Sequence, residues 1–337
     1  MQNDKIEHNS KEEKKALAKE LALKAMLTEF PRSEKGYADR IHGYLYFKYL
    51  LLYIYYMKRP LNKLKPVPDE LVYPKGENYD VIDDQVKMSA DWANMTAQKM
   101  ATNAYHAKVL RIEDARKFFT VDRDVNIPDL PKTILPYEHA RKLIIKNADH
   151  IGLMRCPCRT LQGDKACQPV HVCISIGEPW VSFTMEHNPE AEMRRITKEE
   201  ALQIIDEQHA LGNVQSAFFK DAANDRFYGI CNCCTCCCVA LLANNYAKAP
   251  LFTKSGYVRV TDESKCTACG TCASYCHFFS PTIENGKLCV DTEKCKGCGV
   301  CVDKCPNKAV SLERDDPSVS IPLDLDVLMA ESNQEEG

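Results

Sequence analysis

Residues 266–276 read Cys-Thr-Ala-Cys-Gly-Thr-Cys-Ala-Ser-Tyr-Cys, and residues 295–306 read Cys-Lys-Gly-Cys-Gly-Val-Cys-Val-Asp-Lys-Cys-Pro. Each stretch has the spacing C-x2-C-x2-C-x3-C, a run that holds [4Fe-4S] clusters. Three cysteines at three-residue steps on a tight loop can wrap three corners of a cubane. The fourth starts the following helix and points toward the partner cluster. Gly270, Gly297 and Gly299 allow the loops to take positive φ and approach a cluster closely.

The repeated run resembles the two-cluster bacterial ferredoxin domain. The resemblance implies that one cluster is bound by Cys266, Cys269, Cys272 and Cys305, and the other by Cys295, Cys298, Cys301 and Cys276. One departure is His277, which stands where the second run has Pro306. His277 could donate a hydrogen bond near the cluster or couple to proton transfer, but an ordinary surface histidine is the simpler interpretation. Structural zinc sites also use C-x2-C pairs, but a third cysteine at the same step favours iron and sulfide.

Composition points to metal rather than disulfides. The chain has 337 residues, 19 cysteines and a net charge of −3. Its first residues are polar and show no secretory signal, so we expect a reducing, cytoplasmic compartment, with an anaerobe as the natural setting. Residues 1–66 carry an excess of Lys and Arg, whereas residues 313–337 are acidic. Because a thiolate-bound cubane adds negative charge, we expect the C-terminal domain to attract a basic partner surface.

The N-terminal part of the sequence is helical in pattern. A capping box at residues 10–13 predicts a helix over residues 8–30. The tyrosine-rich apolar run in residues 40–58 is shorter than the roughly 20 residues of a membrane span, so we expect a buried or subunit-facing helix over a membrane-surface helix. Residues 83–119 also read as helical. The candidate core residues there are Trp92, Met95, Met100, Val109, Leu110 and Ile112.

From residue 134 the chain changes character. We expect a helix from Pro136 to Asn147, then a short strand from His150 to Met154 that leads into the first upstream cysteines. A second capping box, at residues 197–200, predicts a helix that continues to Leu211 and ends at Gly212.

Ten further cysteines lie between residues 156 and 238: Cys156, Cys158, Cys167, Cys173, Cys231, Cys233, Cys234, Cys236, Cys237 and Cys238. Such density predicts metal binding, because free thiolates repel one another and oxidise. Neighbouring side chains diverge by about 100° on a helix or 180° on a strand, so these ten cannot all face one small cluster. They split between two clusters, include buried spectators, or hold an unusual larger cluster. We expect one or two additional [4Fe-4S] clusters, with zinc as the alternative.

The resemblance extends upstream of the two cubane runs. The segments Ile-Leu-Pro-Tyr from residue 134, Cys-Pro-Cys-Arg from 156, Thr-Lys-Glu-Glu-Ala from 197 and Ile-Cys-Asn-Cys-Cys from 230 are similar to a family of 4Fe-4S ferredoxin-domain proteins of anaerobic bacteria and archaea. In that family a cysteine-rich module precedes two C-terminal cubane motifs. The resemblance covers roughly residues 134–312 and implies a redox function without naming a partner.

Two single residues have alternative interpretations. Arg159 could hydrogen-bond a cluster sulfide or an anionic substrate, or form a surface salt bridge. Cys289 lies on an expected strand between the two cubane runs, where we expect a small buried hydrophobic residue rather than a ligand.

These patterns predict an α+β protein in four parts. Residues 1–133 form a mainly helical region, 134–250 a cysteine-rich module that binds additional Fe–S, 251–314 a βαββαβ two-cluster domain, and 315–337 an acidic tail. Neither a P-loop nor a dinucleotide fingerprint is present, and no catalytic residue can be named.

Three functions compete. The first is a metal-binding, iron–sulfur electron-transport protein, or a subunit of a larger oxidoreductase complex, that serves redox protein partners. The second is a reductase whose active cluster lies between residues 156 and 238 and is fed by the ferredoxin domain. The third, a DNA-binding regulator, is disfavoured because the tyrosine-rich segment lacks the composition of a recognition helix. No nucleic acid and no transmembrane span are expected.

Overall fold

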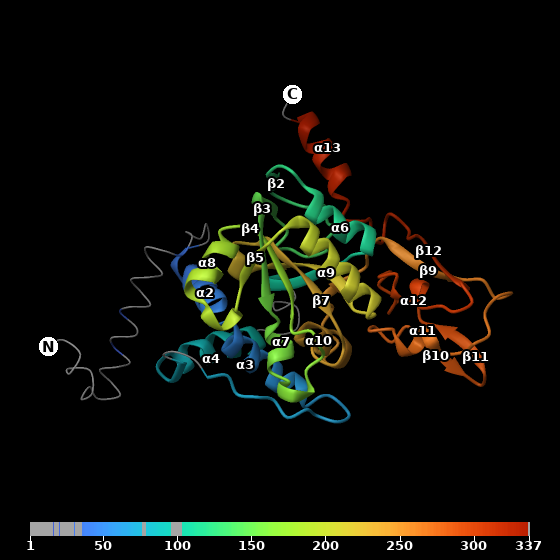
Figure 1. Ribbon diagram of the computed structural model, residues 1–337, viewed down its shortest axis with the longest axis horizontal. Coiled ribbons are helices and arrows are strands. Elements are labelled where there is room, and N and C mark those ends of the chain that lie inside the picture. The colour runs from blue at the N-terminus through green and yellow to red at the C-terminus, as the bar shows by residue number, and fades with distance from the viewer. Residues whose placement is uncertain are drawn as a thin grey trace.

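An eight-stranded sheet forms the centre of the computed structural model, which describes residues 36–75, 79–95 and 103–335 together with Ala16, Glu20 and Phe30 (Figure 1). The strand order is β2-β3-β4-β7-β6-β1-β8, and β5 pairs with β3. Every pairing is antiparallel except β1 with β8. The strands are β1 Tyr105–Val109, β2 Val125–Ile127, β3 Leu143–Arg155, β4 His171–Glu178, β5 Arg194–Ile196, β6 Val214–Lys220, β7 Arg226–Cys233 and β8 Phe252–Thr253.

Helices cover both faces of this sheet. They are α2 Tyr37–Lys48, α3 Leu50–Asn62, α4 Tyr79–Met95, α6 Ile112–Thr120, α7 Pro157–Thr160, α8 Trp180–His187, α9 Lys198–Ala210, α10 Val239–Tyr246 and α13 Leu325–Glu335, with short 3-10 turns η1 Gly163–Lys165, η2 Pro189–Ala191 and η3 Asp221–Ala223. The predicted cap of α9 is confirmed, because the Thr197 side chain accepts a hydrogen bond from the backbone N–H of Glu200 at 3.2 Å.

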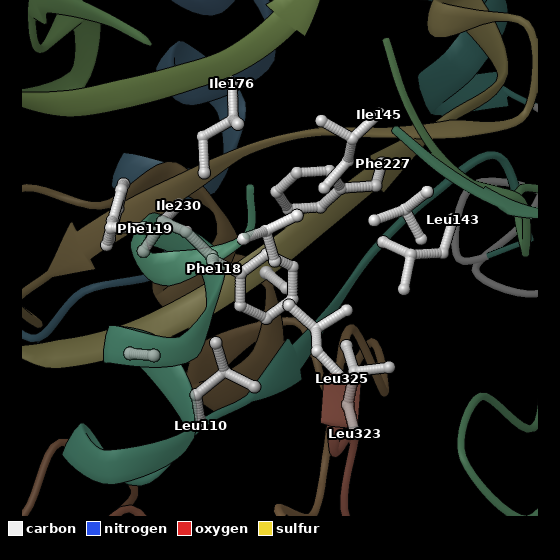
Figure 2. Close-up of a cluster of buried hydrophobic side chains, with 14 of the residues drawn as sticks. Leu110, Phe118, Phe119, Leu143, Ile145, Ile176, Phe227, Ile230, Leu323 and Leu325 are labelled. Carbon is white, nitrogen blue, oxygen red and sulfur yellow. The ribbon is translucent and has the colours of Figure 1, made fainter. Parts of the chain in front are cut away.

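One face of the sheet packs against α6, α9 and α13. Figure 2 shows Phe118 of α6 among side chains of β3 and β7 and next to Leu325 from the C-terminal segment. Alternate side chains of a strand point to opposite faces, so residues such as Ile145 and Ile230 enter this core while their neighbours face the other side. Residues 315–335, expected to be an acidic tail, thus contribute Leu323, Leu325 and Leu328 to the main core.

The other face packs against α2, α3 and α8 through aromatic side chains. Phe47 stacks on Trp180 with ring centroids 4.6 Å apart, and Tyr46 and Tyr53 are buried beside them. The prediction that the tyrosine-rich run is buried is therefore confirmed, although it forms two helices that are separated at Tyr49. Among the residues that the structure describes, no helix is long and apolar enough to cross a membrane.

Two helix predictions are wrong. Residues 83–119 are not one helical segment, because α4 ends at Met95 and β1 pairs with β6 before α6 begins. The helix expected from Pro136 to Asn147 is absent, since Ala140 has a φ of 54° and β3 starts at Leu143. In both places pairing across the sheet overrides local helix propensity. The strand predicted at His150–Met154 is the second half of β3. The helix predicted over residues 8–30 lies outside the described ranges.

The sheet also continues across the boundary that we expected at residue 133. Strands β1 and β2 come from the segment before this residue, and they pair with β6, β8 and β3 from the segment after it. Residues 103–133 are therefore continuous with the cysteine-rich module.

Candidate metal centres

The C-terminal block, residues 255–314, carries the two repeated cysteine runs on paired loops and helices. Its elements are β9 Tyr257–Thr261, α11 Thr271–Ser274, β10 Pro281–Glu284, β11 Lys287–Val290, α12 Val300–Asp303 and β12 Val310–Arg314. β9 pairs with β12 and β10 with β11, both antiparallel. The predicted positive φ angles are confirmed at Gly270, Gly297 and Gly299, with values of 80°, 65° and 87°.

Four thiols of this block form what we name the outer set: Cys266, Cys269, Cys272 and Cys305. All four line one pocket between the α11 loop and the start of the segment that leads to β12. Three come from the first run and one from the second, as the resemblance implies. Cys269 is exposed, and its thiol lies 3.4 Å from the Thr271 hydroxyl. The outer set therefore lies close to the protein surface.

The other four thiols, Cys276, Cys295, Cys298 and Cys301, form the inner set. Burial raises the pKa of Cys298, and the thiols of Cys301, Cys276 and Cys295 raise it further, so the four lie close together. Cys276 and Cys298 pack against the hydrophobic cluster that contains Cys233 and Cys238 of the cysteine-rich module. The inner set thus faces the body of the protein.

Arg259 of β9 lies between these two sets. Its side chain is buried, and its Nη2 atom donates to the Cys272 sulfur of the outer set at 3.5 Å. The same guanidinium lowers the pKa of Cys301 in the inner set, although burial raises that pKa to about 12. Its Nε and Nη1 atoms have no hydrogen-bond partner in the described chain. Buried donors without acceptors are costly, so this arginine fits a site where anionic sulfur lies on both sides.

A compact site, the four-thiol site, consists of Cys167, Cys234, Cys236 and Cys237. Their sulfurs all lie within 4.8 Å of one another, with Cys236 Sγ 2.7 Å from Cys167 Sγ and 3.1 Å from Cys234 Sγ. Four sulfurs at about 2.3 Å from one tetrahedral ion lie about 3.8 Å apart. The spacing therefore matches a single ion more closely than a cubane, whose thiolates are separated by four iron atoms.

The remaining upstream thiols, Cys156, Cys158, Cys173, Cys231, Cys233 and Cys238, form what we name the six-thiol ring. Each contacts two others in the order 156, 158, 238, 233, 231, 173 and back to 156. Cys231 and Cys233 are two residues apart on β7, so they face the same side of the sheet. Cys173 lies beside them on β4, which pairs with β7. All six line one cavity, which Cys234 and Cys237 of the four-thiol site line as well.

The ten upstream cysteines thus divide between two places, one of the alternatives that the sequence left open. The divergence of neighbouring side chains accounts for the division: Cys233 joins the six-thiol ring and Cys234 the four-thiol site, and Cys238 and Cys237 separate in the same way. The backbone N–H groups of Cys237 and Cys238 both donate to the carbonyl of Cys234, which folds the loop tightly enough for this arrangement.

The surface interpretation of His277 is wrong. Its Nδ1 atom accepts hydrogen bonds from the N–H and hydroxyl of Thr235, and its Nε2–H donates to the Gly212 carbonyl at 2.9 Å. Because Nδ1 accepts from the Thr235 N–H, the ring carries its proton on Nε2. Burial lowers the pKa of His277, opposed by the Gly212 carbonyl. His277 follows Cys276, and Thr235 lies between Cys234 and Cys236. This contact therefore joins the inner set to residues 234–238, which we name the cysteine loop.

Two other interpretations are corrected. Cys289 lies on β11 as expected, but it is exposed and not a buried hydrophobic residue. Arg159 forms no surface salt bridge: it is 1% exposed and donates to the carbonyls of Pro169 and Asn232 and to Gln208 Oε1. Arg259 could not be predicted as a site residue, because a single arginine in a strand gives no signal of what it faces.

Comparison with known proteins agrees with the second cubane run. Residues 288–311 match the family described as 4Fe-4S binding domain. No curated protein was found to match the chain. The matched segment includes Cys295, Cys298, Cys301 and Cys305, with the spacing of cubane ligands. The chain therefore contains a 4Fe-4S binding domain near its C-terminus, and it binds at least one 4Fe-4S cluster.

Proposed function

We propose that this protein is an iron–sulfur electron-transfer protein that passes low-potential single electrons between redox protein partners. The observation that carries the proposal is the arrangement of the C-terminal block: two sets of four thiols, one near the surface and one packed against the cysteine-rich module. We further propose that the block is a βαββαβ two-cluster domain with one cubane in each set. The order β9-α11-β10-β11-α12-β12 supports this.

The arrangement orders the two sets along a route between the surface and the cysteine-rich module. The outer set, with its exposed Cys269, is where a partner protein can approach most closely. The inner set faces Cys233 and Cys238 across a shared hydrophobic cluster that also contains Phe252 and Phe278. A thiolate-bound cubane supplies a one-electron step between its 2+ and 1+ states. The protein packs Cys276 and Cys298 of the inner set against the body and fixes the block there, so an electron can pass inward.

Several contacts fix the block in place. His209 of α9 lies 2.6 Å from Asp303 of α12 and 2.8 Å from Gln215 of β6. Lys304 donates to the carbonyl of Ala210, and Asn245 of α10 donates to the His277 carbonyl at 2.9 Å. These contacts join the block to α9 and α10. They support an electron-transfer unit that is held rigidly against the body of the protein.

Full-length protein, purified without oxygen, tests the proposal. We expect at least about eight iron and eight acid-labile sulfide per chain, because each cubane contributes four of each. Dithionite should produce electron paramagnetic resonance signals of reduced cubanes, broadened by interaction between the two. A preparation rich in zinc, without sulfide or a reduced-cluster signal, would contradict the proposal.

The His277→Ala variant should slow electron transfer from the block into the cysteine-rich module. The change leaves the Thr235 N–H and the Gly212 carbonyl without their partner, which costs roughly 1–3 kcal/mol and loosens the contact between Cys276 and the cysteine loop. Rapid-mixing spectroscopy after reduction by a low-potential protein donor measures the rate. His277→Asn, which can still accept from Thr235, should recover part of it.

His209→Gln is the matched control for this variant. His209 also bridges the body and the block, but its partners are Gln215 and Asp303 rather than the cysteine loop. If both variants slow electron transfer equally, the contact between His277 and Thr235 makes no specific contribution to the transfer rate. If neither does, the inner set does not donate across this face.

A further inference from the structure

We infer that the six-thiol ring binds an iron–sulfur cluster larger than a single cubane, held by six thiolates and adjacent to the four-thiol site. The inference deepens the proposed function and rests on it, because it assigns the place where electrons from the inner set arrive. The six thiols line one cavity, and the sulfurs of Cys238 and Cys233 lie 3.3 Å apart.

The ring is built from five separate pieces of the fold. Cys156 follows the end of β3, Cys158 lies in α7, Cys173 lies on β4, and Cys231 and Cys233 lie on β7. Cys238 is the residue before α10. Figure 1 shows α7 and α10 close to α3 below the sheet, and α3 contacts both. Because six cysteines from separate parts of the fold line one cavity, we interpret them as a ligand site and not as ordinary core residues.

The size of the ring excludes a single metal ion. Within the described ranges, the one group of three or more ligand atoms that all lie within 4.8 Å of each other is the four-thiol site. The ring thiols touch their immediate neighbours, as Cys238 and Cys233 do at 3.3 Å, but they surround a cavity instead of converging on a point. One cubane takes four thiolates, which would leave two of the six facing the cluster without a role.

Buried positive charge next to the ring requires anions. Arg159 is 1% exposed, follows Cys158 in the chain and lines the ring cavity. Its Nε atom has no hydrogen-bond partner in the described chain. Lys58 of α3 is completely buried and donates to the Cys158 carbonyl at 2.9 Å. Protonated thiols would leave these cations poorly balanced, whereas metal-bound thiolates and sulfide balance them.

Three tyrosines, Tyr46, Tyr105 and Tyr228, line the same cavity. The hydroxyls of Tyr46 and Tyr228 lie 3.0 Å apart. A tyrosine hydroxyl is a hydrogen-bond donor with an ordinary pKa of about 10, so both can donate into the cavity. Hydrogen bonds to cluster sulfur are one of the means by which a protein sets a cluster's potential. The tyrosines therefore complete a site in which sulfur faces both cations and hydroxyl donors.

The test removes the four-thiol site and measures the iron that remains bound per chain. In the full-length Cys167→Ala/Cys236→Ala variant, two side chains that are not buried are replaced, so the fold should persist. With about eight iron in the C-terminal block, a single cubane in the ring would give about twelve per chain, and a larger cluster must give more. We expect more than twelve iron, with native mass spectrometry under anaerobic conditions giving the mass of the added cluster.

A ring substitution provides the second measurement. Adding Cys173→Ala to this variant should remove all the iron beyond eight in one step, whereas adding Cys289→Ala, on the exposed β11, should remove none. Twelve iron or fewer in the double variant overturns the inference. If the block then still gives the signals of two reduced cubanes, the electron-transfer function stands without it. Loss of those signals from the wild-type protein would instead count against the proposed function itself.

Discussion

Replacing Arg259 with methionine should lower the reduction potentials of the two cubanes that we propose for the C-terminal block by about 130 mV. Reduction adds an electron to sites that are already anionic, and the Arg259 guanidinium, next to Cys272 and Cys301, stabilises the added charge. A unit charge about 5 Å away contributes about 3 kcal/mol at an effective dielectric constant near 20. For one electron, about 1.4 kcal/mol corresponds to 59 mV. Spectroscopic redox titration of the anaerobic protein measures the shift.

Arg314→Met is the control for this prediction. Arg314 lies on β12, the strand paired with β9, so both arginines belong to the C-terminal block, but Arg314 is exposed. Water and salt screen an exposed charge, so this substitution should shift the potentials much less. Arg259→Lys keeps the charge and should retain most of the wild-type potential. Equal shifts in the two methionine variants, with full iron content, would show that Arg259 has no particular relation to the clusters.

Gly297→Ala should prevent the inner set from binding its cluster, with a loss of about four iron per chain. Gly297 lies between Cys295 and Cys298, with a φ of 65°. An added Cβ would lie 2.1 Å from the backbone oxygen of Tyr257 and 2.5 Å from Ser255 Oγ. Ser255 also donates to the Gly297 carbonyl at 2.7 Å, so the loop cannot move away without breaking that bond. Iron analysis and anaerobic thermal unfolding measure the result.

Gly286→Ala separates this steric effect from the backbone cost. Gly286 has a φ of 75°, but nothing lies within 4 Å of an added Cβ. Its substitution should cost only the roughly 1–2 kcal/mol of placing an L-residue in the left-handed region, with iron content unchanged. If Gly297→Ala behaves like Gly286→Ala, close packing of the loop against β9 is not what positions the inner set.

The local parts of this protein could be predicted from its sequence. The two cubane runs have cysteines at three-residue steps, and such spacing places ligands on one loop whatever the rest of the chain does. The same holds for α9, where Thr197 caps the helix and Gly212 follows its end. Helices predicted in residues 83–119 and 136–147 failed where strands β1 and β3 form instead, because their partners are distant in the sequence.

Residue spacing alone therefore determined that the C-terminal block binds a 4Fe-4S cluster, since the ligands of one loop are neighbours in the chain. Only the tertiary structure decided how the ten upstream cysteines divide, because β4, β7, α7 and α10 bring together thiols from opposite ends of an 83-residue stretch, 156–238. It also decided that Arg259 lies between the two thiol sets and that His277 contacts the cysteine loop. Such contacts depend on sheet pairing and helix packing, and no local pattern of residues encodes them.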